Sequence, residues 1–263
     1  MKRAHSHVSI DYYAYISGLG NWNTVYKVIF SLGALVTVIA ANSVFISAAT
    51  IIFMLYLNVI IGKIHGRDYL RLLWVPLSFI LLGGIAIMIQ FGSGKDSLFS
   101  LRFFWTRLYI TKDSLRLSLN TALKAFAAIS AFYMVSLSTP MGEIISVFRK
   151  VHVPELILEL MHLIYRYIFI LSDTNRAQKE AAKSRNGYCD LKTSLRTFSG
   201  EIANLFVMSM KKADMYYDAM EARGYEGDCR FWEEKKALTG GQLAYGILYL
   251  ALLILIFVME RRG

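Results

Sequence analysis

The sequence predicts an all-α integral membrane protein of about five transmembrane helices, with long amphipathic helices between the fourth and fifth spans. Hydrophobic residues make up 56% of the 263 residues and charged residues only 18%. The apolar residues are gathered into long uncharged blocks, whereas charged residues are concentrated between positions 141 and 236. This distribution is typical of a chain whose main solvent is lipid.

The first uncharged block is long enough for two spans joined by a tight turn. It covers residues 28–62, and a single helix of this length would extend about 52 Å, well beyond a hydrocarbon core of about 30 Å. Asn42 and Ser43 are the natural turn, because both side chains compete for backbone hydrogen bonds. We therefore expect spans near 26–41 and 44–62.

Three further blocks predict the remaining spans, at residues 72–94, 117–140 and 237–259. The first of them carries Pro76 and the pair Gly83 and Gly84, where a kink or a close helix neighbour is expected. The second is interrupted only by Lys124, which lies near enough to one end for its ammonium group to reach the headgroups. Residues 26–140 thus hold four spans, and the fifth follows the charged block.

Two other segments suit the membrane interface. Residues 1–25 are rich in tyrosine and are expected to form an N-terminal interfacial segment. Residues 97–113 alternate apolar and polar side chains, with many aromatic and β-branched types, which predicts an interfacial loop or hairpin. Basic residues favour a cytoplasmic N-terminus by a small margin only. The net charge of +10 indicates contact with anionic lipid headgroups and not with nucleic acid, because the basic residues flank apolar blocks or alternate with carboxylates.

The charged block at residues 141–236 predicts two long helices. Over residues 154–187, polar residues recur mostly every three or four positions, so they form one stripe on a helix that is otherwise apolar. Over residues 195–223, the first half is apolar and the second half is charged. Each helix therefore runs from an apolar start to a charged end, and such a helix can lie at the membrane interface.

A similar short sequence occurs at the end of each of these two helices. We call the two helix ends the first tip and the second tip. Glycine after a basic last turn is also the ordinary way in which a helix stops, so a single such phrase would mean little. Small residues let a partner's backbone approach, and a guanidinium group can pair with a carboxylate through two hydrogen bonds. The repetition of the phrase therefore predicts a paired docking device. The first tip is Ser184, Arg185, Asn186 and Gly187, and the second is Ala222, Arg223 and Gly224.

Few residues suggest chemistry carried out by this chain, and we expect no catalytic, cofactor-binding or metal-binding residues. The sequence has no Gly-x-x-x-x-Gly-Lys-Ser/Thr loop for a nucleotide phosphate. Cys189 and Cys229 lack the spacing of a zinc site. His5 and His7 could share a metal ion, but no further ligands lie nearby. A polytopic membrane enzyme remains the alternative from another class, although the sequence contains neither a His-x-x-x-His nor a paired-Asp motif.

Several short motifs along most of the chain carry a resemblance. They lie at residues 10–15, 110–115, 139–140, 153–154, 165–167 and 219–225. Together they resemble the transmembrane T component of energy-coupling factor (ECF) transporters, in particular the CbiQ branch that serves cobalt and nickel uptake. The second tip matches that family's Ala-Arg-Gly triplet, whereas the first keeps only Arg185. The family's Asp-Pro-Arg-x-Lys motif keeps only Lys27.

The resemblance implies a coupling subunit of a multi-pass transporter in a bacterial or archaeal cell membrane. The two tips would cap cytoplasmic coupling helices and dock on two ATP-binding-cassette ATPase subunits, which would bind ATP and magnesium. A separate CbiM-like membrane subunit would bind the cobalt ion, and a small accessory membrane subunit could also take part. Nickel, or a T component shared by vitamin-specific subunits, remains the alternative. We expect the apolar helix start to contact the substrate-binding subunit through Ile157, Leu160, Leu163 and Ile164.

Overall fold

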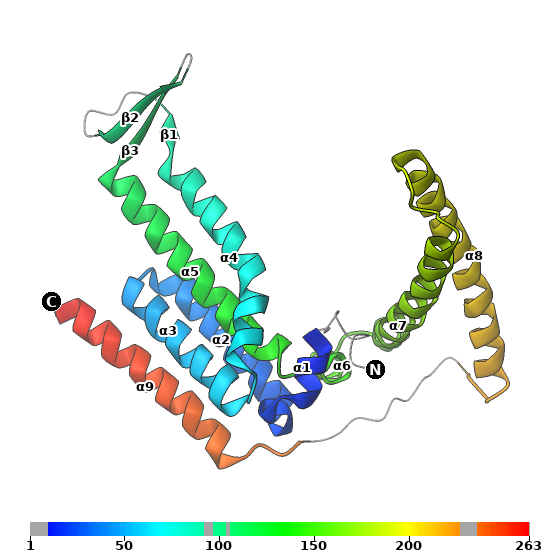
Figure 1. Cartoon of the computed structure of the whole chain (residues 1–263). Coiled ribbons are helices and arrows are strands. Elements are labelled where there is room, and N and C mark those ends of the chain that lie inside the picture. Colours follow the sequence, from blue (N-terminus) through cyan, green and yellow to red (C-terminus); the bar gives the residue numbers. More distant parts are fainter. Residues whose placement is uncertain (1–9, 92–96, 104–105, 227–235, 263) are drawn as a thin grey trace. The chain divides into compact units, whose positions relative to one another are not determined.

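The computed structural model describes residues 10–91, 97–103, 106–226 and 236–262. It divides the chain into two compact units. Unit 1 comprises Met1–Pro140 together with Glu234–Gly263, and unit 2 comprises Met141–Glu233. Unit 2 is therefore an insertion between two parts of unit 1, and Figure 1 shows the helices of both.

Five helices of unit 1 are long and apolar enough to cross a membrane. They are α2 (Thr24–Ala41), α3 (Val44–Tyr56) with its π-helical continuation η2 (Leu57–Ile61), α4 (Gly66–Met88), α5 (Lys112–Ser136) and α9 (Gly240–Arg262). Two short helices, α1 (Ile10–Ile16) and η1 (Gly18–Asn21), precede them. The predicted all-α membrane fold is confirmed for the described residues.

Three helices have boundaries that differ from those of the predicted spans. Helix α4 begins at Gly66 instead of position 72, and α5 covers Lys112–Ser136 instead of 117–140. Charged residues such as Arg67 and Asp68 sit in the first turn of α4, because a helix can extend beyond the hydrocarbon that it crosses. A capping box of Thr111 and Ser114 starts α5, and the helix stops before Pro140. Helix α9 begins at Gly240 instead of position 237.

The turn between α2 and α3 consists of Asn42 and Ser43. Asn42 adopts the left-handed conformation with a φ of 50°, which asparagine tolerates better than most residues. The Ser43 hydroxyl accepts a hydrogen bond from the amide of Ile46, at 3.4 Å, and so caps α3. Ser43 therefore satisfies a backbone amide at the start of α3, and Asn42 supplies the left-handed residue that ends α2.

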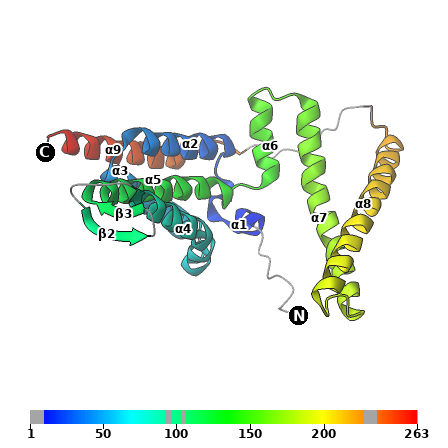
Figure 2. The ribbon, with the colours of Figure 1, turned by 90° about the horizontal axis from the view of Figure 1, so that it is seen from above.

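Helix α5 is the centre of the bundle, and α2, α3 and α4 all pack against it (Figures 1 and 2). Its buried side chains are mostly small, which lets neighbouring backbones approach closely. Hydroxyl groups bond to backbone carbonyls across these interfaces. They are Ser31 to Ala131 at 2.7 Å, Ser118 to Gly84 at 2.6 Å, and Tyr133 to Leu72 at 3.1 Å.

Lys27, near the start of α2, is fully buried. Its Nζ atom donates a hydrogen bond to the carbonyl oxygen of Ser138, at 2.7 Å, just beyond the end of α5. A cation at this place satisfies a carbonyl at a helix C-terminus and interacts favourably with the helix dipole. Lys27 thus joins the start of one span to the end of another.

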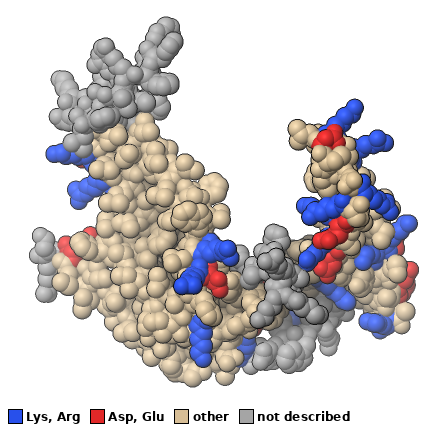
Figure 3. All heavy atoms as spheres, viewed as in Figure 1, with Lys and Arg blue, Asp and Glu red and all other residues tan. Residues whose placement is uncertain are grey.

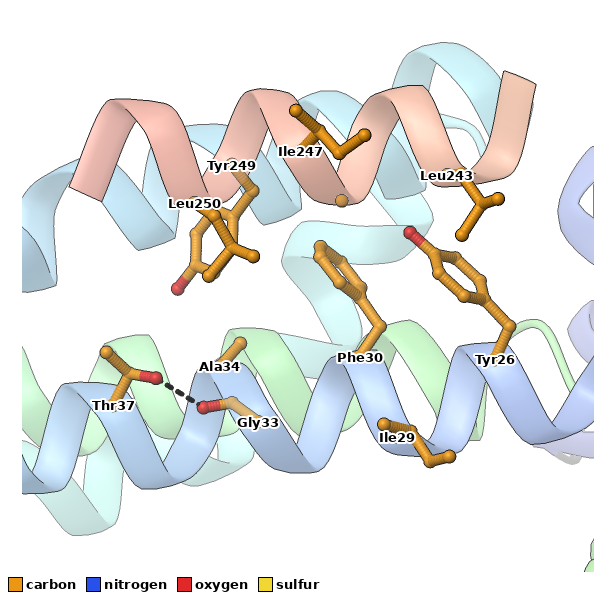
Figure 4. Close-up of a pocket in the computed structure, with 11 residues that line it drawn as sticks. Tyr26, Ile29, Phe30, Gly33, Ala34, Thr37, Leu243, Ile247, Tyr249 and Leu250 are labelled. Carbon is orange, nitrogen blue, oxygen red and sulfur yellow. Dashed lines mark hydrogen bonds between the residues drawn. The ribbon is translucent and has the colours of Figure 1, made fainter. Parts of the chain in front are cut away.

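Helix α9 joins the bundle through α2 and α3. The hydroxyl groups of Thr50 and Tyr249 lie 3.0 Å apart, and the Tyr26 hydroxyl donates to the carbonyl of Gln242 at 2.6 Å. An apolar pocket of about 320 Å³ lies between α2 and α9 (Figure 4). Thr37 bonds to Gly33 at 2.6 Å, so each hydroxyl group in its lining is bonded within the chain. The pocket therefore offers a hydrocarbon surface.

A small antiparallel sheet follows α4 and precedes α5. Its strands are β1 (Gln90–Phe91), β2 (Ser97–Phe103) and β3 (Thr106–Thr111), in the order β1-β3-β2. The register pairs Leu101 with Leu108 and Gln90 with Tyr109. The hairpin therefore occupies most of the segment for which the sequence predicts an interfacial loop or hairpin.

Unit 2 is built from three helices, α6 (Met141–Lys150), α7 (Glu155–Ser184) and α8 (Leu191–Glu221). Helix α6 packs against α7, and α7 packs against α8. Among the described residues of α8 none is fully buried. Unit 2 is therefore thinly packed, and its longest helices keep most of their surface exposed.

We expect Lys27→Met to destabilise unit 1 by about 1–3 kcal/mol, because the Ser138 carbonyl loses a charge-assisted hydrogen bond where water is excluded. Equilibrium unfolding in mixed micelles measures the effect. Lys112→Met, at an exposed position in the first turn of α5, is the matched control. Equal unfolding curves for the two variants would contradict the role of Lys27.

Candidate functional site

The two predicted tips belong to one antiparallel helical hairpin, made of α7 and α8. The helices meet at the turn between Ser184 and Leu191 and diverge from there (Figures 1 and 2). At the turn end, the Thr197 hydroxyl donates to the carbonyl of Gly187, at 2.8 Å. At the open end, the Tyr225 hydroxyl donates to Oε2 of Glu159, at 3.3 Å. The end of each helix thus lies beside the start of the other.

Aromatic side chains bridge the hairpin near its open end. The guanidinium carbon of Arg166, on α7, lies 5.1 Å from the centre of the Tyr216 ring on α8. The ring of Tyr167 meets the same tyrosine edge to face, with centroids 5.4 Å apart. Burial raises the pKa of the Tyr167 hydroxyl above its usual value. Rings and long side chains, more than close backbone packing, therefore hold the diverging helices together.

The first tip ends α7 with a Schellman motif. The amide of Gly187 donates to the carbonyl of Ala182 at 2.9 Å, and the amide of Asn186 donates to Lys183 at 3.1 Å. Asn186 has a φ of 56°, in the left-handed region. This is the backbone pattern in which a helix commonly stops after one left-handed residue.

The second tip repeats this pattern at the end of α8. The amide of Tyr225 donates to the carbonyl of Met220 at 3.1 Å, and the amide of Gly224 donates to Glu221 at 2.9 Å. Gly224 has a φ of 80°. Each donor and each acceptor corresponds to one in the first tip, so the structure aligns Arg185 with Arg223 and Asn186 with Gly224.

The two arginines therefore occupy equivalent places at opposite ends of the hairpin. Both are exposed. Helix α7 has 30 residues, so the arginines are separated by about 45 Å along the helix axis, at a rise of about 1.5 Å per residue. Each also borders a hollow between α7 and α8, of about 470 Å³ at Arg185 and about 490 Å³ at Arg223.

The first tip is fixed to α8 more closely than a free helix end would be. A Cβ atom on Gly187 would lie 2.9 Å from the carbonyl oxygen of Ala182 and 3.0 Å from the Thr197 hydroxyl, so glycine permits the close approach. The Tyr188 hydroxyl donates to both carboxylate oxygens of Glu201, at 2.7 Å, and this bond raises the pKa of Tyr188. At the start of α8, a hydrogen bond from the Thr193 side chain lowers the pKa of Asp190.

The four residues expected to contact a substrate-binding subunit lie near the start of α7 but do not form one surface. Ile157, Leu160 and Ile164 are 47%, 48% and 59% exposed. Leu163 instead lines the hollow between α7 and α8 beside Arg223. Three of the four therefore remain available for a partner of unit 2.

The described residues contain no group of three or more His, Cys, Asp or Glu side chains that could hold a metal ion. Cys189 is an exposed free thiol. His5 and His7 lie outside the residues that the structure describes. The site is therefore one of two protruding helix ends, without an assembled metal centre in the described part of the chain.

Sequence reasoning missed two features of this site. It left the alignment of the first tip open, because Asn186 and Gly187 stand where the family has a single glycine. Within this chain, the left-handed Asn186 corresponds to the left-handed Gly224, and the tolerance of asparagine for positive φ was the available signal. The antiparallel pairing that places the tips at opposite ends depends on contacts between distant residues, such as Glu159 and Tyr225, which helical periodicity cannot show.

Comparison with known proteins places the chain in context. A family model described as CbiQ, cobalt transport protein, matches residues 18–235. The chain is 26% identical to the cobalt transport protein CbiQ of Salmonella typhimurium, over 60% of this chain and 71% of that one. It is 29% identical to the energy-coupling factor transporter transmembrane protein EcfT of Exiguobacterium sibiricum, over 92% of this chain and 94% of that one.

A longer relative contains a similar sequence as one part. It is described as a putative fused cobalt transport protein, CbiMQ, of Methanocorpusculum labreanum, and is 28% identical over 93% of this chain. The match covers only 41% of that relative's own length. The rest of the fused protein lies outside the match.

We expect Gly224→Val to destabilise the second tip by about 1–2 kcal/mol, because a side chain there must adopt left-handed backbone. Space is open around this glycine, so the cost comes from the backbone alone. Hydrogen exchange of the Tyr225 amide should become faster. Gly200→Val, within α8 and also in open space, is the matched control, and equal exchange in both variants would contradict the assignment.

Proposed function

Because the chain belongs to the CbiQ family of cobalt transport proteins, the T components of ECF transporters, we propose that it couples ATP hydrolysis to cobalt uptake. Its two tips dock on two ATP-binding-cassette ATPase subunits. Its helices transmit the motion of these subunits to a separate membrane subunit that binds the cobalt ion. The chain is a membrane component of a transporter in the cell membrane and not a catalytic enzyme.

The repeated tip geometry is the observation that carries this proposal. Two helix ends with equivalent hydrogen bonds and a left-handed residue at the same position present Arg185 and Arg223 to solvent. A pair of similar docking elements suits a pair of similar partners, and the exposed guanidinium groups can pair with carboxylates. The separation of about 45 Å along the hairpin lets each tip meet a different subunit.

The packing of the hairpin supports a transmitting role. None of the described residues of α8 is fully buried, and side chains such as Arg166 and Tyr216 bridge α7 and α8. Helices joined in this way can slide or rotate against each other without opening a tight core, which is the small shear motion seen in other moving proteins. ATP-driven closure of the two ATPases would draw the tips toward each other and so change the angle between α7 and α8.

The substrate-binding subunit would contact the start of α7. Ile157, Leu160 and Ile164 offer an exposed apolar surface there, which suits adaptable packing against another helix. The name of the fused relative CbiMQ supports a CbiM-like partner for this chain. A small accessory membrane subunit is compatible with the same arrangement.

The cofactors of transport would then reside on the partners. ATP and magnesium would bind to the ATPases, and cobalt to the CbiM-like subunit. In a second candidate function, the same coupling subunit serves substrate-binding subunits for nickel or vitamins. The similarity to EcfT over nearly the whole of both chains supports a coupling subunit but names no substrate. In either case the coupling mechanism of this chain is the same.

We expect the double variant Arg185→Glu and Arg223→Glu to abolish ATP-driven uptake by the complex, because both docking cations become repulsive to carboxylates. Accumulation of radioactive cobalt in cells, with the partner subunits co-expressed, measures the effect. Pull-down of the detergent-solubilised chain followed by mass spectrometry shows which ATPase is retained.

Lys211→Glu, an exposed residue on α8 away from both tips, is the control for a general change of charge. The control should retain uptake. Full uptake and normal ATPase retention in the double variant would contradict the proposed docking role of both tips.

A further inference from the structure

The two tips share one backbone geometry but carry opposite charge. The segment 176–187 contains four basic side chains and one acidic side chain. The corresponding segment 214–225 contains one basic side chain and three acidic ones. The equivalent hydrogen bonds of the two tips align these segments position by position, so each residue of one segment has a counterpart in the other.

The neighbouring helix leaves the sign of each end unchanged. At the turn end, the start of α8 adds the exposed cations Lys192 and Arg196 against Asp190 and Glu201. At the open end, the start of α7 adds Glu155 and Glu159 against Arg166, and Tyr225 bonds to Glu159. The hairpin is therefore basic at its turn and acidic at its open end.

The charges at the tips are displayed to solvent. Lys179 and Lys183 are exposed beside Arg185, and Asp218 and Glu221 are exposed beside Arg223. Figure 3 shows basic and acidic side chains spread over the hairpin, in contrast to the largely uncharged face of the membrane bundle. A partner that approaches either tip meets these charges before it reaches the helix end.

We propose that the turn end docks first, on an acidic surface of the ATPase partner, and that the open end then docks through short-range contacts. The inference rests on the proposed function and assigns different roles to the two tips. Opposite charges across an interface increase the association rate more than they increase final affinity. The open end, with Met220 partly buried and Tyr225 beside Arg223, has apolar groups for the later contact.

A protein surface explains both tips better than a lipid surface does. A helix end that projects one arginine between small residues, such as Ser184 and Asn186, fits a shaped groove. Lipid headgroups place no such demand on backbone geometry.

The test compares two double variants with the same change of net charge. Lys179→Gln with Lys183→Gln removes two positive charges from the turn end, whereas Lys211→Gln with Lys212→Gln removes two from the middle of α8. The full chain is placed in nanodiscs of neutral lipid, and the rate of association with the ATPase that co-purifies with it is measured from low to high salt.

We expect the Lys179 and Lys183 variant to associate about 10-fold more slowly at low salt, with the difference lost near about 0.5 M salt because screening removes the attraction. The Lys211 and Lys212 variant should change the rate less than about 2-fold. Dissociation rates should remain similar in all three proteins, because long-range attraction acts mainly on encounter.

Other outcomes would overturn the inference. Equal slowing by both variants would mean that only the total charge matters. Binding of the wild-type chain to vesicles of anionic lipid, lost in the Lys179 and Lys183 variant while ATPase association is unchanged, would assign the basic end to the membrane. If the wild-type chain binds no ATPase at all, the proposed function itself fails. ATPase binding that depends on Arg185 and Arg223 but not on salt would retain the proposed function and refute only this inference.

Discussion

The structure depends on one constraint, which is that a polar group within hydrocarbon must find its partner inside the protein. Around α5, the hydroxyl groups of Ser31 and Ser118 meet this constraint because they bond to backbone carbonyls across helix interfaces. Small side chains bring the helices near enough for these bonds. Lys27 applies the same principle to a charge, since its ammonium group satisfies a carbonyl beyond the last turn of α5. In unit 2, Arg185 and Arg223 at the two helix ends are exposed to solvent.

Much of the fold could be predicted from the sequence, because lipid imposes simple requirements on length and charge. The turn at Asn42 and Ser43 was visible as a polar pair in an apolar block, and α2 and α3 indeed end and begin on either side of it. The span boundaries were less predictable. Helix α4 starts at Gly66, well before the expected position 72, because hydropathy reports where hydrocarbon ends and not where hydrogen bonding ends. Residues such as Arg67 and Asp68 are charged and nevertheless helical.

The sequence predicted two helix-end motifs, but it did not show that both belong to one helical hairpin. Sequence spacing showed that Arg185 and Arg223 follow similar helices, and composition showed that small residues surround them. The equivalence of Asn186 and Gly224 required backbone angles, since their side chains differ and only their conformation agrees. The charge difference between the tips is already visible in segments 176–187 and 214–225, and the antiparallel pairing adds Glu159 to the second tip from a helix that begins far earlier in the sequence.

The insertion of unit 2 between parts of unit 1 has a consequence for biosynthesis. A ribosome makes the helices from α2 to α5 first, then all of unit 2, and only then α9. The Thr50 and Tyr249 hydroxyls, which pair in the finished bundle, belong to residues on opposite sides of unit 2 in the sequence. Until α9 is made, the rings of Phe30 and Phe53 therefore lack the Tyr249 ring that they contact in the finished bundle. Apolar rings are stable in hydrocarbon, so the bilayer that restricts the architecture also keeps these side chains away from water before the bundle is complete.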